Sequence, residues 1–316
     1  MDNLTHSLTG LMMSRAGLSR YHRYAPLALL LSANAPDIDG LSIFSGPLTY
    51  IRYHRGLAHS IPFMPVMTLL PFLVVLAITR KLEGWLRLYL LCLAGVASHL
   101  LLDWTNTYGV RFLTPFSDRW FSLDLNSLID PWIWAVLIFA WLMLYIMRLV
   151  SGEIGAKKAT GRGLAVFALV FFLSYDFGRY LLRQRALAVL NARMYDAAAP
   201  MRVAAFPAGG NPLVWRGWVE TSTFFKRFDF SVTGDFDPAG GTTFYKPEQT
   251  NAVDAARTTP LFRQFLWFDQ YPRWDVVPVD QPEGGSRVEL KDLRLSFTAV
   301  AILDKMNRVV NTSFRF

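Results

Sequence analysis

Residues 88–103 read LYLLCLAGVASHLLLD, an apolar run that ends in a histidine and an aspartate. The run approaches the ~17–25 residues that an α-helix needs to cross a bilayer. His99 and Asp103 are four residues apart, so on a helix both side chains project from one face and can share one metal ion or bridge two. Ionisable groups are costly at membrane depth and tend to be functional there. This stretch predicts a membrane helix with a functional site at its end.

Other apolar stretches predict a bundle around this helix. Residues 62–79, 131–147 and 164–182 are long and nearly uncharged, as membrane spans are. Two shorter runs, at 4–14 and 25–35, are too short to span fully and are expected to be half-inserted or buried helices.

The charged residues are unevenly distributed along the chain. Residues 1–182 hold 25 charged side chains, whereas the shorter segment 183–316 holds 31. An average soluble domain is about 25% charged, so the first part is typical of a membrane domain and the second of a water-facing one.

The C-terminal part has the pattern of a β domain. Polar and apolar residues alternate with period two in 214–219, 228–232 and 287–290, and Gly- and Pro-containing turns separate these stretches. The expected fold class is α+β: an α-helical integral membrane bundle over residues 1–185, which carries the site, followed by an extracytoplasmic, antiparallel β-rich soluble domain over residues 186–316.

Lys and Arg in the short loops predict the orientation of the bundle. One set of loops holds Arg15, Arg20, Arg23, Arg80, Lys81, Arg87, Arg148, Lys157, Lys158 and Arg162. The opposite loops hold only Arg52, Arg55, Arg111 and Arg119. The first set is expected to face the cytoplasm, which places the C-terminal domain outside.

The histidines and several aspartates converge in this topology. Their positions are the start of the first helix (His6), the end of the second (Asp37 and Asp39), the start of the third (His54 and His59) and the end of the fourth (His99 and Asp103). In an up-and-down bundle all four ends lie on the same side. Imidazole and carboxylate are ligands for zinc, manganese or iron, so the sequence predicts a metal site there.

Other catalytic classes are disfavoured. The chain has no Gly-x-Ser-x-Gly motif or Walker-type phosphate loop, and its single cysteine, Cys92, lies in an apolar span. The formal charge of +8 is scattered rather than gathered in basic runs, so no nucleic-acid partner is expected.

Four motifs together resemble a known family. Thr5-His6, Pro36-Asp37-x-Asp39, His54-Arg55-Gly56-x-x-His59-Ser60 and His99-x-x-x-Asp103 resemble the YdjM-like, LexA-regulated membrane-bound metal-dependent hydrolases of bacteria. The resemblance covers residues 1 to about 150. It implies an inner-membrane location and a relationship to zinc-dependent phospholipase C and single-strand nucleases.

The resemblance also implies a ligand set. The residues carried over are His6, Asp37, Asp39, His54, His59, His99 and Asp103. Seven ligands exceed the three or four that one catalytic zinc ion uses, so two or three zinc ions are expected, with manganese as an alternative.

The expected function is a membrane-bound, metal-dependent phosphoester hydrolase. Its substrate would be a lipid or a lipid-linked molecule at the outer face of the inner membrane, since a site at membrane depth meets lipids first. Asp37 or Asp39 is expected to bridge metals or act as general base, and Arg55 to bind a phosphate oxygen. The sequence specifies no protein partner and leaves open whether Asp124 and Asp130 join the site.

Two other classes of function remain as alternatives. A metal or proton transporter predicts polar residues along both halves of several spans, whereas the cytoplasmic halves here are almost entirely apolar. A metal-binding membrane regulator without hydrolase activity predicts a closed structural site, which usually has four ligands, often including cysteine. A metal peptidase or amidase also stays open, although no His-Glu-x-x-His motif is present.

Overall fold

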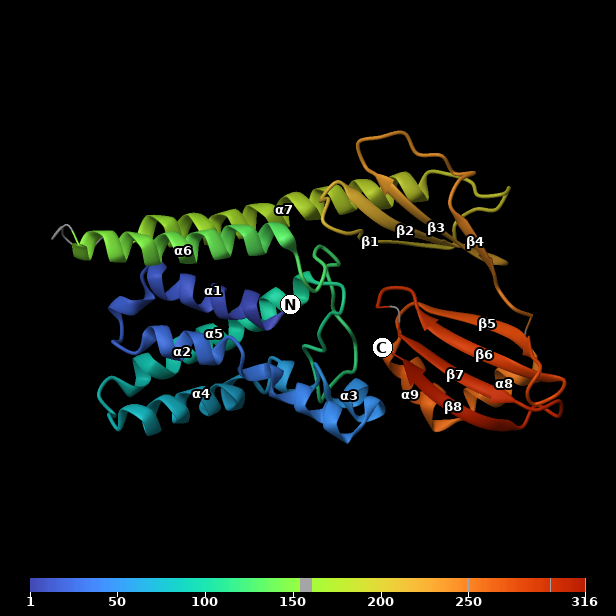
Figure 1. Cartoon of the computed structure of the whole chain (residues 1–316), viewed down its shortest axis with the longest axis horizontal. Helices are drawn as coiled ribbons and strands as arrows, with labels where there is room; N and C mark the ends of the chain where they lie inside the picture. Colours follow the sequence, from blue (N-terminus) through green and yellow to red (C-terminus); the bar gives the residue numbers. More distant parts are fainter. Residues whose placement is uncertain (154–160, 249, 296, 316) are drawn as a thin grey trace. The chain divides into compact units, whose positions relative to one another are not determined.

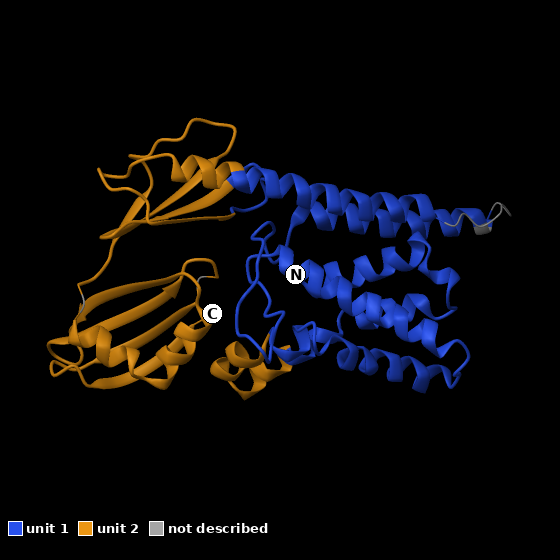
Figure 2. Cartoon of the chain, turned by 180° about the vertical axis from the view of Figure 1, so that it is seen from behind, with its two compact units in different colours: residues 1–39, 55–184, 207–214 blue, residues 40–54, 185–206, 215–316 orange. Residues whose placement is uncertain are grey.

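The computed structural model describes residues 1–153, 161–248, 250–295 and 297–315. The chain forms two compact units (Figure 2). The first unit comprises residues 1–39, 55–184 and 207–214, and the second comprises residues 40–54, 185–206 and 215–316. Segment 40–54 therefore groups with the C-terminal part, although it is expected in the membrane domain. Lys157 and Lys158, which the topology argument uses, lie outside the described residues.

The first unit is a bundle of α-helices (Figure 1). Its helices are α1 (Asn3–Ala16), α2 (Ala25–Ser32), α4 (Met64–Thr79), α5 (Trp85–Thr105), α6 (Pro131–Glu153) and most of α7 (Arg162–Asn191). Short 3₁₀ helices connect them at Leu18–Arg20, Ala35–Ser45 and Leu57–His59. Asp2 begins α1 by accepting hydrogen bonds from two backbone N–H groups of the first turn.

Several helical segments are long and apolar enough to cross a membrane. By length and composition, four segments among the described residues qualify: Ala25–Ser45, Trp85–Thr105, Pro131–Ser151 and Arg162–Asn191. Pro47–His59 and Met64–Thr79 qualify only as a pair, bent by 87°. The run at 25–35 is thus part of a longer segment than the sequence predicts, because the 3₁₀ helix Ala35–Ser45 extends it. These spans make the chain a membrane protein.

Small residues allow α2 to pack closely against α1 and α5. A Cβ atom at Gly10 would lie 2.6 Å from the Leu29 carbonyl oxygen, and one at Gly95 would lie 2.9 Å from the Ser32 Cβ. Helices within membranes associate through close approach at small residues, because the hydrophobic effect contributes little to helix association there. The contacts fix α2, and with it the start of the segment that carries Asp37.

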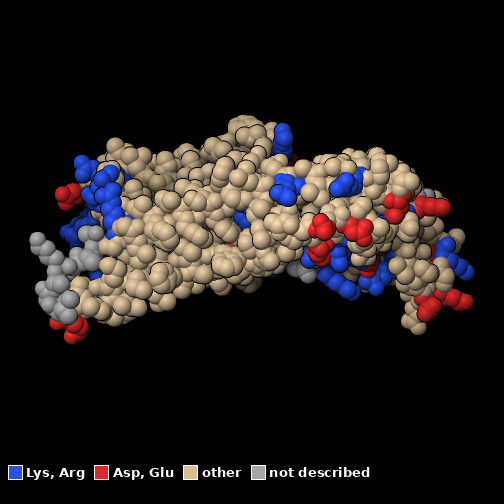
Figure 3. Space-filling view, turned by 90° about the horizontal axis from the view of Figure 1, so that it is seen from above, with Lys and Arg blue, Asp and Glu red and all other residues tan. Residues whose placement is uncertain are grey.

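Lys and Arg side chains gather at one end of the bundle (Figure 3). Arg15 lies in the last turn of α1 there, and Arg162 at the start of α7 donates to the Ala16 carbonyl at 2.8 Å. His22 Nε2 lies 3.2 Å from the Glu83 carbonyl oxygen, so the loops before α2 and α5 meet at the same end. The helices alternate in direction, as the sequence predicts.

The second unit contains two four-stranded sheets. The first sheet has the order β1-β2-β3-β4, formed by β1 (Arg202–Pro207), β2 (Val214–Glu220), β3 (Phe224–Ser231) and β4 (Thr242–Tyr245). The second sheet is antiparallel in chain order, formed by β5 (Pro272–Val279), β6 (Gly285–Asp292), β7 (Thr298–Leu303) and β8 (Val309–Arg315). The predicted α+β class is confirmed.

Short helices complete the second unit. These are α3 (Pro47–Tyr53), α8 (Asn251–Arg257) and α9 (Pro260–Phe268). Thr259 caps the start of α9 by accepting from the Phe262 N–H, and Pro260 occupies the first turn, where no N–H donor is needed. The buried face of α9 packs on β7 and β8, with Phe265 against Phe314.

Candidate metal centre

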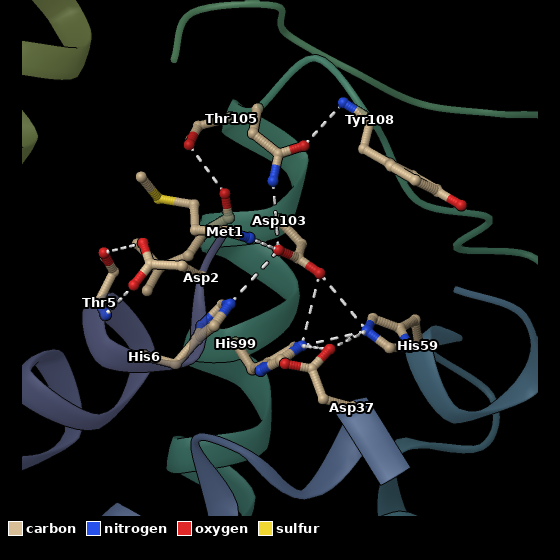
Figure 4. Close-up of polar contacts among 12 residues, drawn as sticks. Met1, Asp2, Thr5, His6, Asp37, His59, His99, Asp103, Thr105 and Tyr108 are labelled. Atoms are coloured by element: carbon tan, nitrogen blue, oxygen red, sulfur yellow. Dashed lines mark hydrogen bonds and ion pairs between the residues drawn. The ribbon is translucent and has the colours of Figure 1, made fainter. Parts of the chain in front are cut away.

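Four side chains from three segments of the first unit converge at the end of α5 (Figure 4). His99 and Asp103 lie one turn apart on α5, as their spacing predicts. His59 ends the 3₁₀ helix Leu57–His59, and Asp37 lies in the first turn of the 3₁₀ helix Ala35–Ser45. We call these four residues the metal cluster.

Five of the six distances between the donor atoms of the metal cluster are close to those of a tetrahedral site. His59 Nε2 lies 3.1 Å from His99 Nε2, 3.5 Å from Asp37 Oδ1 and 3.4 Å from Asp103 Oδ2. His99 Nε2 lies 3.6 Å from Asp37 Oδ1 and 3.4 Å from Asp103 Oδ2. Zinc bonds of ~2.0–2.1 Å in a tetrahedron separate the ligand atoms by about 3.3–3.4 Å. The four residues therefore fit one divalent ion.

Hydrogen bonds behind the imidazoles turn both Nε2 atoms inward. His99 Nδ1 donates to the Ala33 carbonyl oxygen at 2.6 Å, and His59 Nδ1 donates to Asp39 Oδ2 at 2.9 Å. Such bonds fix the tautomer and ring orientation of metal-binding histidines. Asp39 therefore positions His59 from outside the metal cluster, and its predicted role as a ligand or general base stays a prediction.

Arg55 holds Asp103 in place. Its Nη2 donates to Asp103 Oδ1 at 3.0 Å, and its Nη1 donates to the Asn106 side-chain oxygen and the Gly109 carbonyl, both at 3.1 Å. The guanidinium lies 4.6 Å from the centre of the Tyr108 ring. This arrangement gives Arg55 a positioning role, and its predicted contact with a phosphate stays a prediction.

The second oxygen of Asp103 indicates a cation. Oδ1 receives Arg55 and the amino group of Met1, whereas the buried Oδ2 has no hydrogen-bond partner among the described residues. Leaving such an oxygen unsatisfied costs about 1–3 kcal/mol, and more when it is charged. A divalent ion facing Oδ2 and the two Nε2 atoms would offset this cost.

Besides Asp39, two other predicted ligands lie outside the metal cluster. His6 is buried and stacks on His99 with ring centres 3.8 Å apart, and its Nε2 lies 3.4 Å from Asp103 Oδ1. His54 belongs to the second unit, where it stacks on Tyr50 with ring centres 4.5 Å apart. Metal binding by either residue, and a second or third ion, stay predictions.

Asn106 and Tyr108, which belong to none of the sequence motifs, complete the surroundings, together with Asp124 and Asp130, whose part in the site the sequence leaves open. Asn106 and Tyr108 both contact Arg55, and Asn106 could have been noticed because it follows His99 by seven residues, on the same helix face. Asp124 pairs with Arg183 at 2.7 Å. Asp130 caps α6 and accepts from the Tyr175 hydroxyl at 3.1 Å. Both aspartates thus have partners outside the metal cluster.

Membrane-spanning helices around a buried His/Asp cluster define a membrane protein with a candidate metal centre. The chain belongs to the YdjM inner membrane protein family, which its residues 1–186 match. The family resemblance inferred from the motifs is thereby confirmed. The chain is also 34% identical over 254 residues to a Bacillus subtilis (strain 168) protein described as "Uncharacterized protein YfhP", covering 79% of this chain and 72% of that protein. No solved structure matches it.

Proposed function

We propose that this protein is a membrane-bound, metal-dependent hydrolase that cleaves a phosphoester in a lipid or lipid-linked substrate. The observation that carries the proposal is the metal cluster, in which two imidazole nitrogens and two carboxylate oxygens lie within 4.8 Å of one another. Histidine with carboxylate is a ligand set of hydrolytic zinc sites. Zinc is the proposed ion, with manganese as the alternative.

The burial of the four residues supports two kinds of role for them. His59, His99 and Asp103 are fully buried, whereas the Asp37 side chain retains 15% of its exposure. A catalytic zinc ion has three protein ligands and one open position. We assign the permanent ligands to the three buried residues, and Asp37 to the side from which water and substrate enter.

Each of these residues would then have its own role in hydrolysis. A bound divalent ion supplies Lewis acidity and lowers the pKa of water toward about 7. Asp37 accepts the proton of the attacking water, because its carboxylate is the one in the metal cluster that reaches solvent. Asp39 and Arg55 hold His59 and Asp103 in position from behind.

The position of the metal cluster supports a lipid substrate. Asp37, His59 and Asp103 lie at the helix ends opposite the end where Arg15 and Arg162 meet. Excess Lys and Arg marks the cytoplasmic end of a bundle, so we place the metal cluster at the outer face. Apolar side chains are exposed close to it in sequence, namely Ile38, Leu57 and Ile61. Lipid headgroups are the phosphoesters that such a site meets first.

A specific observation also favours a second function, a metal-binding membrane protein without hydrolase activity. Four protein donors complete a tetrahedron, and closed four-ligand sites are typical of structural zinc. The two functions differ in what Asp37 does. In a hydrolase it is dispensable for metal retention, whereas in a structural site it is a full ligand.

Metal content and turnover of the detergent-purified full chain test the proposal. We expect wild type to retain zinc and to cleave a chromogenic phosphodiester or a defined phospholipid, with loss on chelation and recovery on adding zinc or manganese. His99→Ala should lose both properties, and Asp37→Asn should keep the metal and lose turnover. Loss of metal in Asp37→Asn, with no turnover in wild type, would support the structural site instead. Wild type with no more metal than His99→Ala would refute both.

A further inference from the structure

We infer that Arg111 binds the anionic oxygens of the substrate beside the metal cluster. The inference rests on the proposed function, because it concerns the group that the metal-dependent reaction would attack. It adds a residue that the sequence argument used only as a marker of topology.

Two hydrogen bonds place the Arg111 segment alongside the metal cluster. The Gly109 carbonyl accepts from Arg55 Nη1 at 3.1 Å, and the Phe112 carbonyl accepts from the Ile61 N–H at 2.9 Å. Residues 109–112 therefore run beside residues 55–61, and His59 lies within that second stretch. Burial lowers the pKa of Arg111, while the charges of Asp118, Tyr108 and, to a smaller extent, Asp39 raise it.

The surroundings of Arg111 suit the binding of an anion. The residue is only 3% exposed and lies against the Trp120 ring, 5.2 Å from its centre. Its Nη1 is 3.4 Å from Asp118 Oδ1, a long contact to a carboxylate whose side chain is 64% exposed. Because the Asp118 carboxylate reaches solvent, a substrate phosphate can compete with it for the Arg111 guanidinium. A guanidinium binds phosphate through two parallel hydrogen bonds.

Two other arginines close in sequence to these segments are less suited to this role. Both terminal nitrogens of Arg55 donate to protein oxygens, and moving them would release Asp103. Arg119 is exposed and lies over Phe121. It carries the same charge in the same loop, which makes it the matched control.

The test measures binding of inorganic phosphate to zinc-loaded, detergent-purified full chain by isothermal titration calorimetry. Zinc content and melting temperature are recorded for each variant. Wild type should bind phosphate, and Arg111→Gln should bind it about tenfold to a hundredfold more weakly at unchanged zinc content. Arg111→Lys should recover part of the affinity, since it restores the charge without the planar fork. Arg119→Gln should match wild type, and Asp118→Asn should bind phosphate more tightly.

The outcomes separate this inference from the proposed function. Equal phosphate affinity in Arg111→Gln and wild type, or no phosphate binding by zinc-loaded wild type, would overturn the role of Arg111 and leave the metal centre standing. Equal weakening in Arg111→Gln and Arg119→Gln would show that phosphate affinity depends on the net charge rather than on Arg111 itself, and would also overturn the inference. If Arg111→Gln fails to fold, Arg111→Lys and Asp118→Asn decide: wild-type affinity in both overturns the inference. A wild type without zinc overturns the metal centre and this inference together.

Discussion

Asp39 and His59 form a carboxylate–imidazole pair in which Nδ1 donates to Oδ2 at 2.9 Å, and the same oxygen accepts the backbone N–H of Arg55 at 3.0 Å. The carboxylate thus fixes the ring of His59 and the backbone at Arg55, four residues before it. His99 is fixed in the same way by the Ala33 carbonyl. Each histidine of the metal cluster is held by a group outside the cluster.

Substitution of Asp39 should weaken metal binding without abolishing it. Loss of the partner behind a metal-bound histidine typically lowers metal affinity about tenfold to a hundredfold. We expect Asp39→Asn near the lower limit and Asp39→Ala near the upper one, measured by competition with a chelator. Asp235→Asn, an exposed change in the second unit, is the charge-matched control. Complete loss of metal in Asp39→Ala, as in His99→Ala, would instead make Asp39 a ligand.

Removal of Arg55 should destabilise the first unit. Arg55→Gln removes one of the two cationic groups that contact the buried Asp103 Oδ1 and leaves the amino group of Met1, and breaking a buried pair from one side costs up to about 3–5 kcal/mol. Chemical unfolding in detergent should show this loss, and zinc content should fall with it. Arg52→Gln removes an exposed arginine three residues away and should have little effect. Equal stability of the two variants would contradict the positioning role.

The sequence predicts the convergence of the site better than the role of each residue. The spacing of His99 and Asp103 and the alternation of helix ends follow from local patterns, so they can be predicted without knowledge of tertiary contacts. The Asp37-x-Asp39 pair is different because it lies on a 3₁₀ helix, where the side chains of residues two apart point in directions about 120° apart. One carboxylate therefore enters the metal cluster while the other turns to His59 Nδ1. The sequence pattern does not distinguish them.

In the β domain, too, the sequence predicts local structure but not the contacts between segments. The alternating stretches at 214–219, 228–232 and 287–290 correspond to β2, β3 and β6, so strand existence follows from a local period. Division of the strands into two sheets depends on pairings between residues, such as Val288 with Ala301. The grouping of segment 40–54 with this unit likewise arises from contacts between α3 and α9. No local pattern encodes those contacts.

Alanine at Gly10 should destabilise the bundle, whereas alanine at Gly178 should not. A Cβ at Gly10 meets the Leu29 backbone, which cannot move aside cheaply, and such overpacking typically costs 1–3 kcal/mol. A Cβ at Gly178 meets nothing within 4 Å, and alanine favours a helix over glycine by up to about 1 kcal/mol. Melting temperatures in detergent should therefore fall for the first variant and hold or rise for the second. A rise for Gly10→Ala would contradict the close packing of α1 on α2.

The stability of the second unit should fall as the pH rises because of Asp269. Burial, and then the charge of Asp292, raise the pKa of Asp269 well above its ordinary value. The unfolded chain releases this proton near pH 4, while the folded chain retains it. The contribution of the protonated Asp269 carboxyl to stability is therefore complete below about pH 4 and is lost as the pH rises through the pKa of the folded state.

Asp269→Asn mimics the protonated carboxyl and should remove this dependence. We expect the variant to protect the β5–β8 amides from hydrogen exchange more than wild type at about pH 8, with the difference shrinking toward about pH 4. Asp235→Asn, at an exposed position in the same unit, should follow wild type throughout. A difference between Asp269→Asn and wild type that is constant with pH would show that the carboxyl is ionised in the fold.

The proposed orientation predicts opposite labelling of two introduced cysteines. Ser117 lies in the loop that pairs with Ile61 through Phe112, near the metal cluster. Lys81 lies at the Arg-rich end, in the loop whose Glu83 carbonyl contacts His22. An impermeant maleimide should label Ser117→Cys in intact cells and Lys81→Cys only after permeabilisation. The native thiol, Cys92, is buried and should give little background. The reverse pattern would put the metal cluster on the cytoplasmic side and remove the outer-leaflet substrate from the proposal, while leaving the metal chemistry intact.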